Sequence, residues 1–202
     1  SVMAEFTAKD VQKLRQASGA GMMDAKKALD EATGDFDAAL QALREKGLAK
    51  ADSRSDRESS NGAIAIAQNE NAVALVELKS ETDFSAKAED FLTLTQEIAE
   101  LVLAGGEDSV AEKSAEIDDL RIAKKENIQL GTVRRIDIEG GSIVDAYLHT
   151  DQEGRGINGV VVQGKDVSSE VLHEVALHIA FAKPSALSRD EVPSEEIEKE
   201  RE

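Results

Sequence analysis

Apolar and polar residues alternate at helical spacing through most of the first fifty residues. Three successive stretches each carry an apolar stripe, and short glycine-containing breaks separate them. This pattern predicts three short helices that share one buried face. Thr7–Asp10 has the pattern of a capping box at the start of the first helix. Gly19 is expected to end the first helix, and Gly47 is expected to end the third.

The pattern then changes from helical spacing to strand-like alternation. Residues 50–61 are dense in serine and charge and contain Ala51 as their one apolar residue, so they cannot bury a face. Ile64 and Ile66 alternate with alanines, a polar turn follows, and the aliphatic run Val73–Leu78 returns. This pattern predicts a β-hairpin, after which apolar residues at helical spacing predict a helix that reaches about residue 103.

A hairpin followed by a helix is predicted again in the second half of the chain. Val133–Ile138, a Gly-Gly turn and Ile143–Leu148 have the pattern of a second hairpin. Val160–Val162 predicts one more strand. Apolar residues spaced over 171–179 predict an amphipathic helix, which the Lys-Pro pair at 183–184 is expected to end.

Together these patterns predict an α+β protein, because each predicted helix follows an antiparallel hairpin and does not connect two parallel strands as in a βαβ unit. We assign residues 3–49 to a three-helix domain and 50–61 to a linker. The core is expected to consist of two hairpin-plus-helix subdomains, over 62–126 and 127–202. The charged end of the chain, from Glu191, has helical spacing and stops in mid-pattern, which predicts the start of a truncated helical extension.

Composition excludes several classes of partner. The 202 residues include 24 Lys and Arg against 41 Asp and Glu, for a formal net charge of −17. A surface of this charge repels phosphates, so we expect neither direct nucleic-acid binding nor docking on an anionic membrane. The chain has no cysteine and no apolar run long enough to span a bilayer. These features favour a cytoplasmic protein.

Few residues form a pattern that suggests catalysis or a cofactor. Glu81 and Asp83 could act as a general acid–base pair, but no nucleophile or metal-ligand cluster accompanies them. Asp83 fits better as the N-cap of the helix that follows. His173 and His178 are about 140° apart around a helix, so they cannot chelate one ion. His178 is expected in or beside the core, whereas His149, at the end of a strand, is expected to be exposed. No phosphate-binding loop motif is present, and we predict no catalytic residue, cofactor or metal.

An aromatic side chain stands at the junction between the first hairpin and its helix. Thr82–Ser85 contains Phe84, in a chain that has only five Phe, one Tyr and no Trp. If the helix begins at Phe84, then Phe84 and Phe91 are seven residues apart and point the same way, which favours a buried Phe84. The alternative is a plug for the core of a partner. Met22 and Met23 are expected to pack inside the bundle, although thioethers also suit a contact surface.

Four stretches, in order along nearly the whole chain, resemble bacterial translation elongation factor Ts. They are Gly19–Leu29 (GAGMMDAKKAL), Glu77–Lys87 (ELKSETDFSAK), Tyr147–His149, and Ala176–Ala180 with the Lys-Pro pair that follows. The chain resembles a C-terminally shortened member, because longer members continue past the stretch matched at Glu198–Arg201. The Lys-Lys pair at 124–125 stands where the family pattern has Ile-Gly, so the partner contacts of the Ile-Gly pair are not carried over to this chain.

The resemblance implies both a fold and a function. It implies a ubiquitin-associated-like three-helix domain before the α+β core, and guanine-nucleotide exchange on the GTPase elongation factor Tu. Phe84 would insert into the GTPase domain and disturb its Mg²⁺ and phosphate site, so that GDP leaves. The Mg²⁺-dislocating segment would comprise Thr82, Asp83, Phe84 and Ser85, and further partner contacts would come from His149, Lys26, Met22 and Met23. No covalent chemistry is implied.

Two other functions are compatible with the residues. The chain could be a pure interaction module, whose bundle binds a helix or peptide without altering a nucleotide site. It could also be a hydrolase that uses Glu81 and Asp83, which is the weaker alternative. The oligomeric state is open, and a homodimer or a 2:2 complex with the GTPase is compatible with the sequence.

Overall fold

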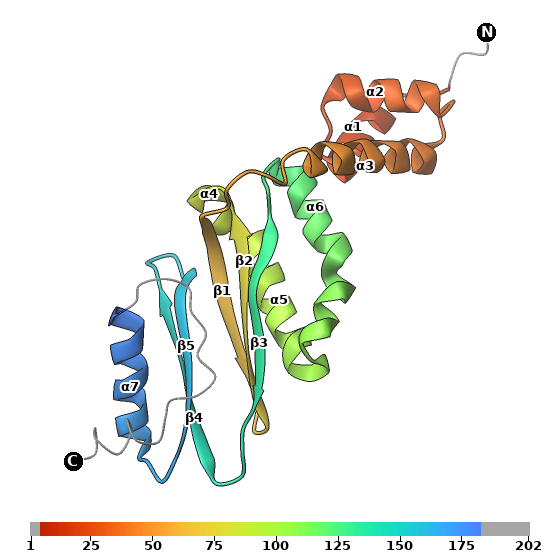
Figure 1. Cartoon of the computed structure of the whole chain (residues 1–202). Coiled ribbons are helices and arrows are strands. Elements are labelled where there is room, and N and C mark those ends of the chain that lie inside the picture. The colour runs from red at the N-terminus through yellow and green to blue at the C-terminus, as the bar shows by residue number, and fades with distance from the viewer. Residues whose placement is uncertain (1–4, 183–202) are drawn as a thin grey trace. The chain divides into compact units, whose positions relative to one another are not determined.

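The computed structural model describes residues 5–182 (Figure 1). Within this range the chain forms two compact units. One contains residues 5–57 together with 118–127, and the other contains residues 58–117 together with 128–182. The described residues form helices and two small antiparallel sheets, which confirms the α+β class. None of the described helices is long and apolar enough to cross a membrane.

The first unit contains the predicted three helices, α1 (Ala8–Ser18), α2 (Met22–Glu31) and α3 (Phe36–Asp52). The capping box is confirmed: the Asp10 amide donates to the Thr7 hydroxyl, and the Thr7 amide donates to the Asp10 carboxylate. Gly19 ends α1 in the left-handed conformation, as expected. The buried core is small and rich in alanine, and it consists of Val11, Leu14, Ala25, Ala28, Leu29, Ala39 and Leu43.

The prediction that Gly47 ends the third helix is wrong, because α3 continues to Asp52 and so takes in the first residues of the expected linker. Gly47 is needed for another reason. A Cβ at this position would lie 2.9 Å from Cγ2 of Ile122, on helix α6 (Ser114–Lys124). The missing side chain therefore lets the end of α6 pack closely against α3 within the same unit.

The second unit is built on a three-stranded sheet. The predicted first hairpin is confirmed, with β1 (Asn61–Gln68) antiparallel to β2 (Ala72–Ser80). On its other edge β2 pairs with β3 (Gln129–Asp137). The boundary proposed between residues 126 and 127 therefore separates β3 from the strand to which it is hydrogen-bonded.

The predicted second hairpin is wrong in its pairing. Strand β4 (Ser142–Thr150) pairs with β5 (Gly156–Lys165), in a separate two-stranded sheet, and not with β3. The buried strand β2 has two edges whose backbone groups need partners, and β3 pairs with the edge that β1 leaves open. The Gly-Gly turn at 140–141 thus carries the chain from one sheet to the next.

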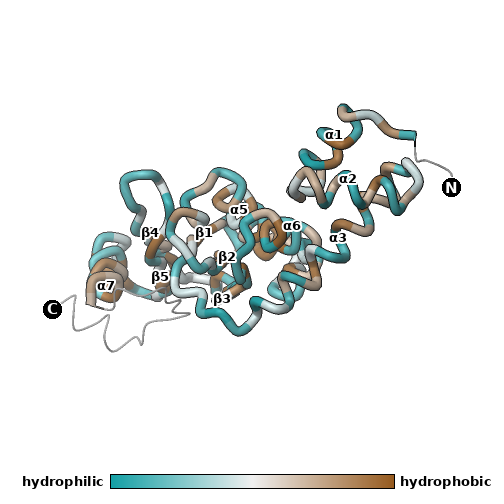
Figure 2. Tube along the Cα trace, turned by 90° about the horizontal axis from the view of Figure 1, so that it is seen from above, coloured by the Kyte–Doolittle hydropathy of each residue, from teal (hydrophilic) through white to brown (hydrophobic). Residues whose placement is uncertain are grey.

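Four layers form the core of this unit, and Figure 2 shows their order. Helix α5 (Glu89–Gly105) covers one face of the three-stranded sheet, and the β4–β5 sheet packs on the other. Helix α7 (Ser169–Ala182) covers the outer face of β4–β5. Strand β5 alternates accordingly, with Val160 and Val162 toward α7 and Val161 toward the three-stranded sheet.

A short 3₁₀ helix, η1 (Glu107–Lys113), connects α5 to α6 and takes up the first residues of the single helix that the sequence pattern predicts over 109–125. The expected helix stop at 183–184 and the charged extension lie outside the described residues.

We predict that Gly47→Ala lowers the stability of the bundle unit by about 1 kcal/mol. Alanine at an ordinary helix position would gain about 1 kcal/mol, but overpacking against Ile122 costs about 1–3 kcal/mol. Urea unfolding of Gly47→Ala, Ile122→Ala and the double variant tests this. In the Ile122→Ala background the added methyl group has room, so the same substitution should be neutral or stabilising. A stabilising effect in the wild-type background would contradict the packing argument.

Candidate functional site

The Thr82–Ser85 segment lies at the exit of β2, in a single helical turn, α4 (Asp83–Ala86). The expectation that Asp83 caps the helix is wrong. Thr82 is the N-cap, and its hydroxyl accepts a hydrogen bond from the Ser85 amide at 3.2 Å. Asp83 stands in the first turn instead, where its carboxylate is exposed and forms an ion pair with Lys87 at 3.4 Å. A carboxylate at this position also suits the positive end of the turn.

Hydrogen bonds to the sheet hold the backbone on the N-terminal side of this turn. The Ser80 hydroxyl donates to the carbonyl of Thr82 at 2.8 Å, and the Asn61 amide donates to the carbonyl of Glu81 at 3.0 Å. On the C-terminal side, Ser85 and Ala86 are buried. The position of the turn is therefore set from both sides by groups that are shielded from solvent.

Phe84 projects from this anchored turn into solvent, with 85% of its surface exposed. The burial that residue spacing favoured is wrong, whereas Phe91 is completely buried. The prediction from residue spacing is wrong because α4 ends at Ala86 and α5 begins separately at Glu89. The two phenylalanines are on different helices, so their seven-residue separation does not place them on one face.

His149 lies near the end of β4, on the face that carries α7. It is half-buried, where the sequence predicted exposure, because aromatic side chains surround it. The Tyr147 hydroxyl is 3.2 Å from its Nδ1 atom, and the Phe181 ring packs edge-on with a centroid separation of 5.7 Å. Phe181 itself is 65% exposed. This cluster presents an aromatic surface beside the end of the strand.

The loop between β4 and β5 begins next to His149, and it contacts the turn that carries Phe84. Glu153 in this loop is 3.9 Å from the ammonium group of Lys87, just after α4. Arg155 donates to the carbonyl of Gly62 on β1 at 3.1 Å. Figure 1 shows α4 and this loop at the same end of the unit. The structure thus brings two of the predicted partner contacts, Phe84 and His149, to one end of the core.

Asp151 organises this loop. One carboxylate oxygen accepts from the backbone amides of Glu153 and Arg155, and the other accepts from the Arg155 guanidinium at 3.1 Å. Burial of the carboxyl group raises its pKa, but these hydrogen bonds outweigh burial, so the pKa of Asp151 lies below its ordinary value.

The remaining predicted contacts lie on α2, in the other unit. Met22 and Met23 are 53% and 75% exposed, so the expectation that they pack inside the bundle is wrong. Ala25 and Leu29 take the buried positions of this helix, and Lys26 is exposed beside the methionines. Two adjacent flexible thioethers and a cation on one exposed helix are a typical contact surface.

The residues considered for catalysis do not form a reaction site. Asp83 is exposed and pairs with Lys87, while Glu81 is half-buried. His178 is exposed on α7, although the helical pattern had suggested a place beside the core, and His173 pairs with Asp145 at 3.0 Å. Within residues 5–182, no group of three or more His, Asp or Glu side chains is arranged to hold a metal ion.

Comparison with known proteins identifies the family. The family model described as elongation factor TS matches residues 81–202, which include both Phe84 and His149. Elongation factor Ts of Cutibacterium acnes is 45% identical over 208 residues, covering 97% of this chain and 74% of the relative. The proteins of that name from Xanthomonas campestris pv. campestris and Paenarthrobacter aurescens are 42% and 38% identical over 98% of this chain. These matches cover 69% and 76% of the two relatives.

The chain belongs to the elongation factor Ts family. The resemblance inferred from four short stretches is therefore confirmed over nearly the whole chain. Membership does not by itself assign a role to any side chain, so the roles of Phe84, His149 and the α2 residues depend on geometry and on the experiments below.

We predict that truncating the two phenylalanines changes the stability of this family member by very different amounts. Phe84→Ala should change the free energy of unfolding by less than about 0.5 kcal/mol, because the ring is exposed. Phe91→Ala should cost about 3–5 kcal/mol, because it removes a buried ring. Urea unfolding of the two variants measures both. A cost at Phe84 comparable to that at Phe91 would mean that the ring is part of the core in solution.

A second prediction concerns pH. Because folding lowers the pKa of Asp151, its stabilisation is present above the unfolded-state value of about 3.9 and is lost as pH falls through the lower folded-state value. Asp151→Asn retains an acceptor for the two amides but loses the charged bond to Arg155. It should cost about 1.5 kcal/mol at pH 7. The stability difference between wild type and variant should shrink from pH 6 to pH 3, and a constant difference would refute the assignment.

Proposed function

We propose that this protein is a guanine-nucleotide exchange factor for elongation factor Tu, and that it promotes GDP release during translation elongation in the cytoplasm. Membership of the elongation factor Ts family supports this role. The observation that carries the proposal is the 85% exposure of Phe84, on a turn that the buried residues Ser80, Ser85 and Ala86 hold in place. A large aromatic side chain displayed on an anchored backbone is suited to inserting into the core of a partner.

In this proposal Thr82–Ser85 presses on the GTPase domain, and Phe84 inserts into it as a wedge. The insertion disturbs the Mg²⁺ and phosphate site, so GDP binds less tightly. The exchange factor must bind the nucleotide-free GTPase more tightly than the nucleotide-bound form, and linkage then requires that it weaken nucleotide binding by the same factor. Such an effect needs no covalent chemistry. A rigid turn favours it, because little of the insertion energy is lost in ordering the wedge.

Other residues would add affinity and orientation. His149, at the same end of the core as Phe84, would form a second contact with the GTPase. Lys26, with Met22 and Met23, would contact it from the bundle, to which we assign a ubiquitin-associated-like fold. The division of the core into two subdomains and a homodimeric or 2:2 assembly with the GTPase belong to the same proposal.

The decisive experiment follows the release of fluorescent GDP from elongation factor Tu. Wild-type protein should accelerate release, and Phe84→Ala should reduce that acceleration by at least tenfold, because a central aromatic anchor contributes about 2 kcal/mol or more. Ile143→Ala is the matched control, since Ile143 is also an exposed apolar side chain but stands at the start of β4. This control should retain full activity.

Binding to nucleotide-free elongation factor Tu, measured by calorimetry, separates the alternatives. If the wild-type protein binds but does not accelerate release, it is a pure interaction module. If Phe84→Ala and Ile143→Ala reduce release equally, Phe84 is not a specific wedge. Hydrolysis of any substrate that Asp83→Asn abolishes would revive the enzyme alternative.

A further inference from the structure

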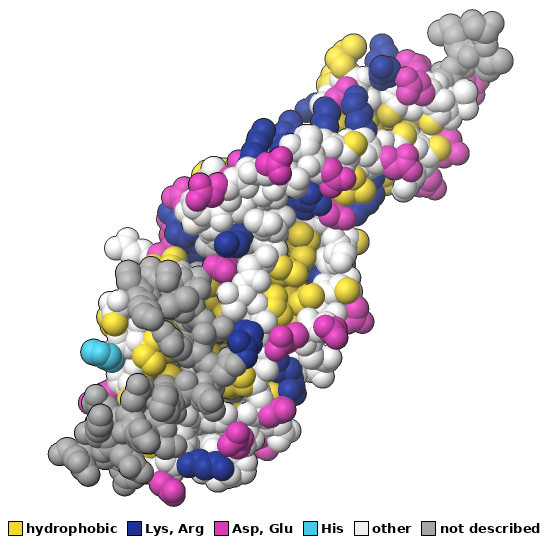
Figure 3. Space-filling view, in the orientation of Figure 1, with side chains coloured by type: hydrophobic (Ala, Val, Ile, Leu, Met, Phe, Trp, Pro, Cys, Tyr) yellow, Lys and Arg dark blue, Asp and Glu magenta, His cyan; other side chains and the backbone are white. Residues whose placement is uncertain are grey.

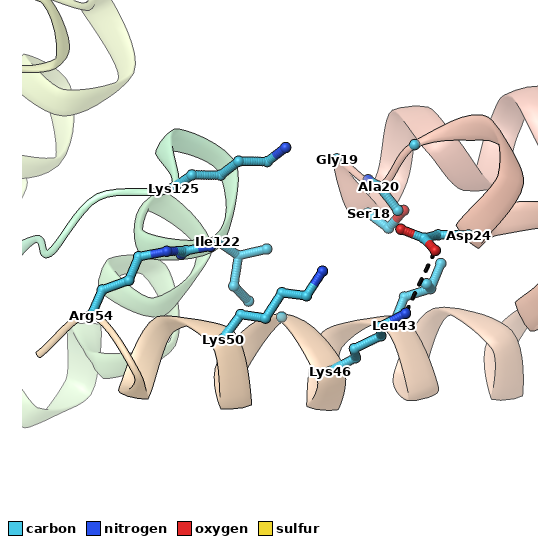
Figure 4. Close-up of a pocket in the computed structure, with 12 residues that line it drawn as sticks. Ser18, Gly19, Ala20, Asp24, Leu43, Lys46, Lys50, Arg54, Ile122 and Lys125 are labelled. Carbon is cyan, nitrogen blue, oxygen red and sulfur yellow. Dashed lines mark hydrogen bonds and ion pairs between the residues drawn. The ribbon is translucent and has the colours of Figure 1, made fainter.

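A small cavity of about 90 Å³ lies within the unit that contains the bundle. The loop between α1 and α2, the second half of α3 and the end of α6 form its walls (Figure 4). Four cationic side chains line it, those of Lys46, Lys50, Arg54 and Lys125. Asp24 is the single carboxylate among the residues that line it.

The positive charge of this cavity is not balanced by the protein. Asp24 is 3.5 Å from the Lys46 ammonium group, so that pair is neutral overall. The side chains of Lys50, Arg54 and Lys125 have no carboxylate partner within residues 5–182, although the chain has 41 acidic residues. Figure 3 shows Lys and Arg side chains on the surface of the bundle, interspersed with Asp and Glu side chains. Lys50 and Lys125 are exposed to solvent, so their charges cost little by themselves, but three cations that lack a carboxylate partner among the described residues give the cavity a positive potential that attracts an anion.

Arg54 gives independent evidence for a ligand. Its Nη1 atom is buried and has no hydrogen-bond acceptor among the described residues. A guanidinium N–H group withdrawn from water without an acceptor is destabilising, and nearly all buried donors are paired in folded proteins. Figure 4 shows the side chain reaching from the turn after α3 toward Ile122, into the wall of the cavity. An acceptor supplied from outside the chain would satisfy it.

The backbone at Lys125 is strained at the same place. Its φ angle is 56°, in the left-handed region that glycine adopts at the ends of helices with no steric cost. A lysine held in this conformation immediately after α6 keeps an ammonium group at the cavity. Backbone strain of this kind is often found at ligand-binding sites.

We propose that this cavity binds a phosphate dianion, either free or as the end group of a phosphomonoester. Three cations suit a dianion better than a single carboxylate, and the planar guanidinium of Arg54 matches phosphate oxygens. The cavity is well below the roughly 300 Å³ at which pockets for larger organic ligands begin, so the phosphoryl group alone fits inside. Gly21 precedes α2 and offers no side-chain cap, which leaves the first amides of the helix available to the anion.

Thermal unfolding and amide NMR spectra of the full chain test this site. Both are recorded in sodium phosphate, in glycerol 3-phosphate and in sodium chloride at matched ionic strength and pH. At about ten times its dissociation constant, phosphate should raise the unfolding temperature of the bundle by about 6–11 °C relative to chloride. The amide signals of Gly19, Ala20 and Gly21 should shift in the same titration. A response to phosphate alone identifies the free anion, and a response to both probes identifies the phosphoryl group.

Four variants make the test specific. Arg54→Gln and Lys50→Gln should abolish the response, whereas Lys27→Gln should keep it, because Lys27 pairs with Glu31 outside the cavity. Lys125→Gly should act in two opposite directions. It should raise the unfolding temperature in chloride by about 2–4 °C, because it removes the backbone strain, and yet lose the response to phosphate.

Two results would overturn the proposal. One is the absence of any response to either phosphate probe beyond that of chloride. The other is a response that persists undiminished in Arg54→Gln, Lys50→Gln and Lys125→Gly, which would mean general screening of the surface by salt.

Discussion

The end of the core that carries Phe84 depends on how the chain leaves β2. Hydrogen bonds from Ser80 and Asn61 fix the backbone before the turn, and the burial of Ser85 and Ala86 fixes it afterwards. A single helical turn has no stability of its own in water, so these contacts are what maintain its conformation. The exposed ring is thereby held in one position, which allows it to act on a partner with little loss of conformational entropy.

The sheet that supports this turn is stable because it is buried on both faces. Helix α5 covers one face and the β4–β5 sheet covers the other, so alternate side chains of β1 and β2 meet different layers. The same stacking brings the loop after His149 to the turn, through the contacts of Lys87 with Glu153 and of Arg155 with β1. Packing of the layers, and not sequence proximity, therefore assembles the candidate partner surface.

Charge is distributed in a way that the net value of −17 conceals. The acidic composition argues against binding to nucleic acid over large areas, because such binding needs many phosphate contacts. It does not prevent a small local site, since Coulomb interactions act over short distances at physiological ionic strength. The cavity between α3 and the end of α6 is lined by cationic side chains from segments that are more than seventy residues apart in the sequence. Composition alone cannot reveal such a cluster.

The sequence by itself determined most of the secondary-structure elements, the capping box at Thr7, the first hairpin and the family, because periodicity, capping and motifs are local properties. Only the tertiary structure decided the partner of β3, the role of Gly47, and the exposure of Phe84 and of the methionines on α2. Each of these depends on where a helix ends or on which distant segment packs against it. The spacing of Phe84 and Phe91 shows why, since a two-residue interruption between helices was enough to separate a buried ring from an exposed one.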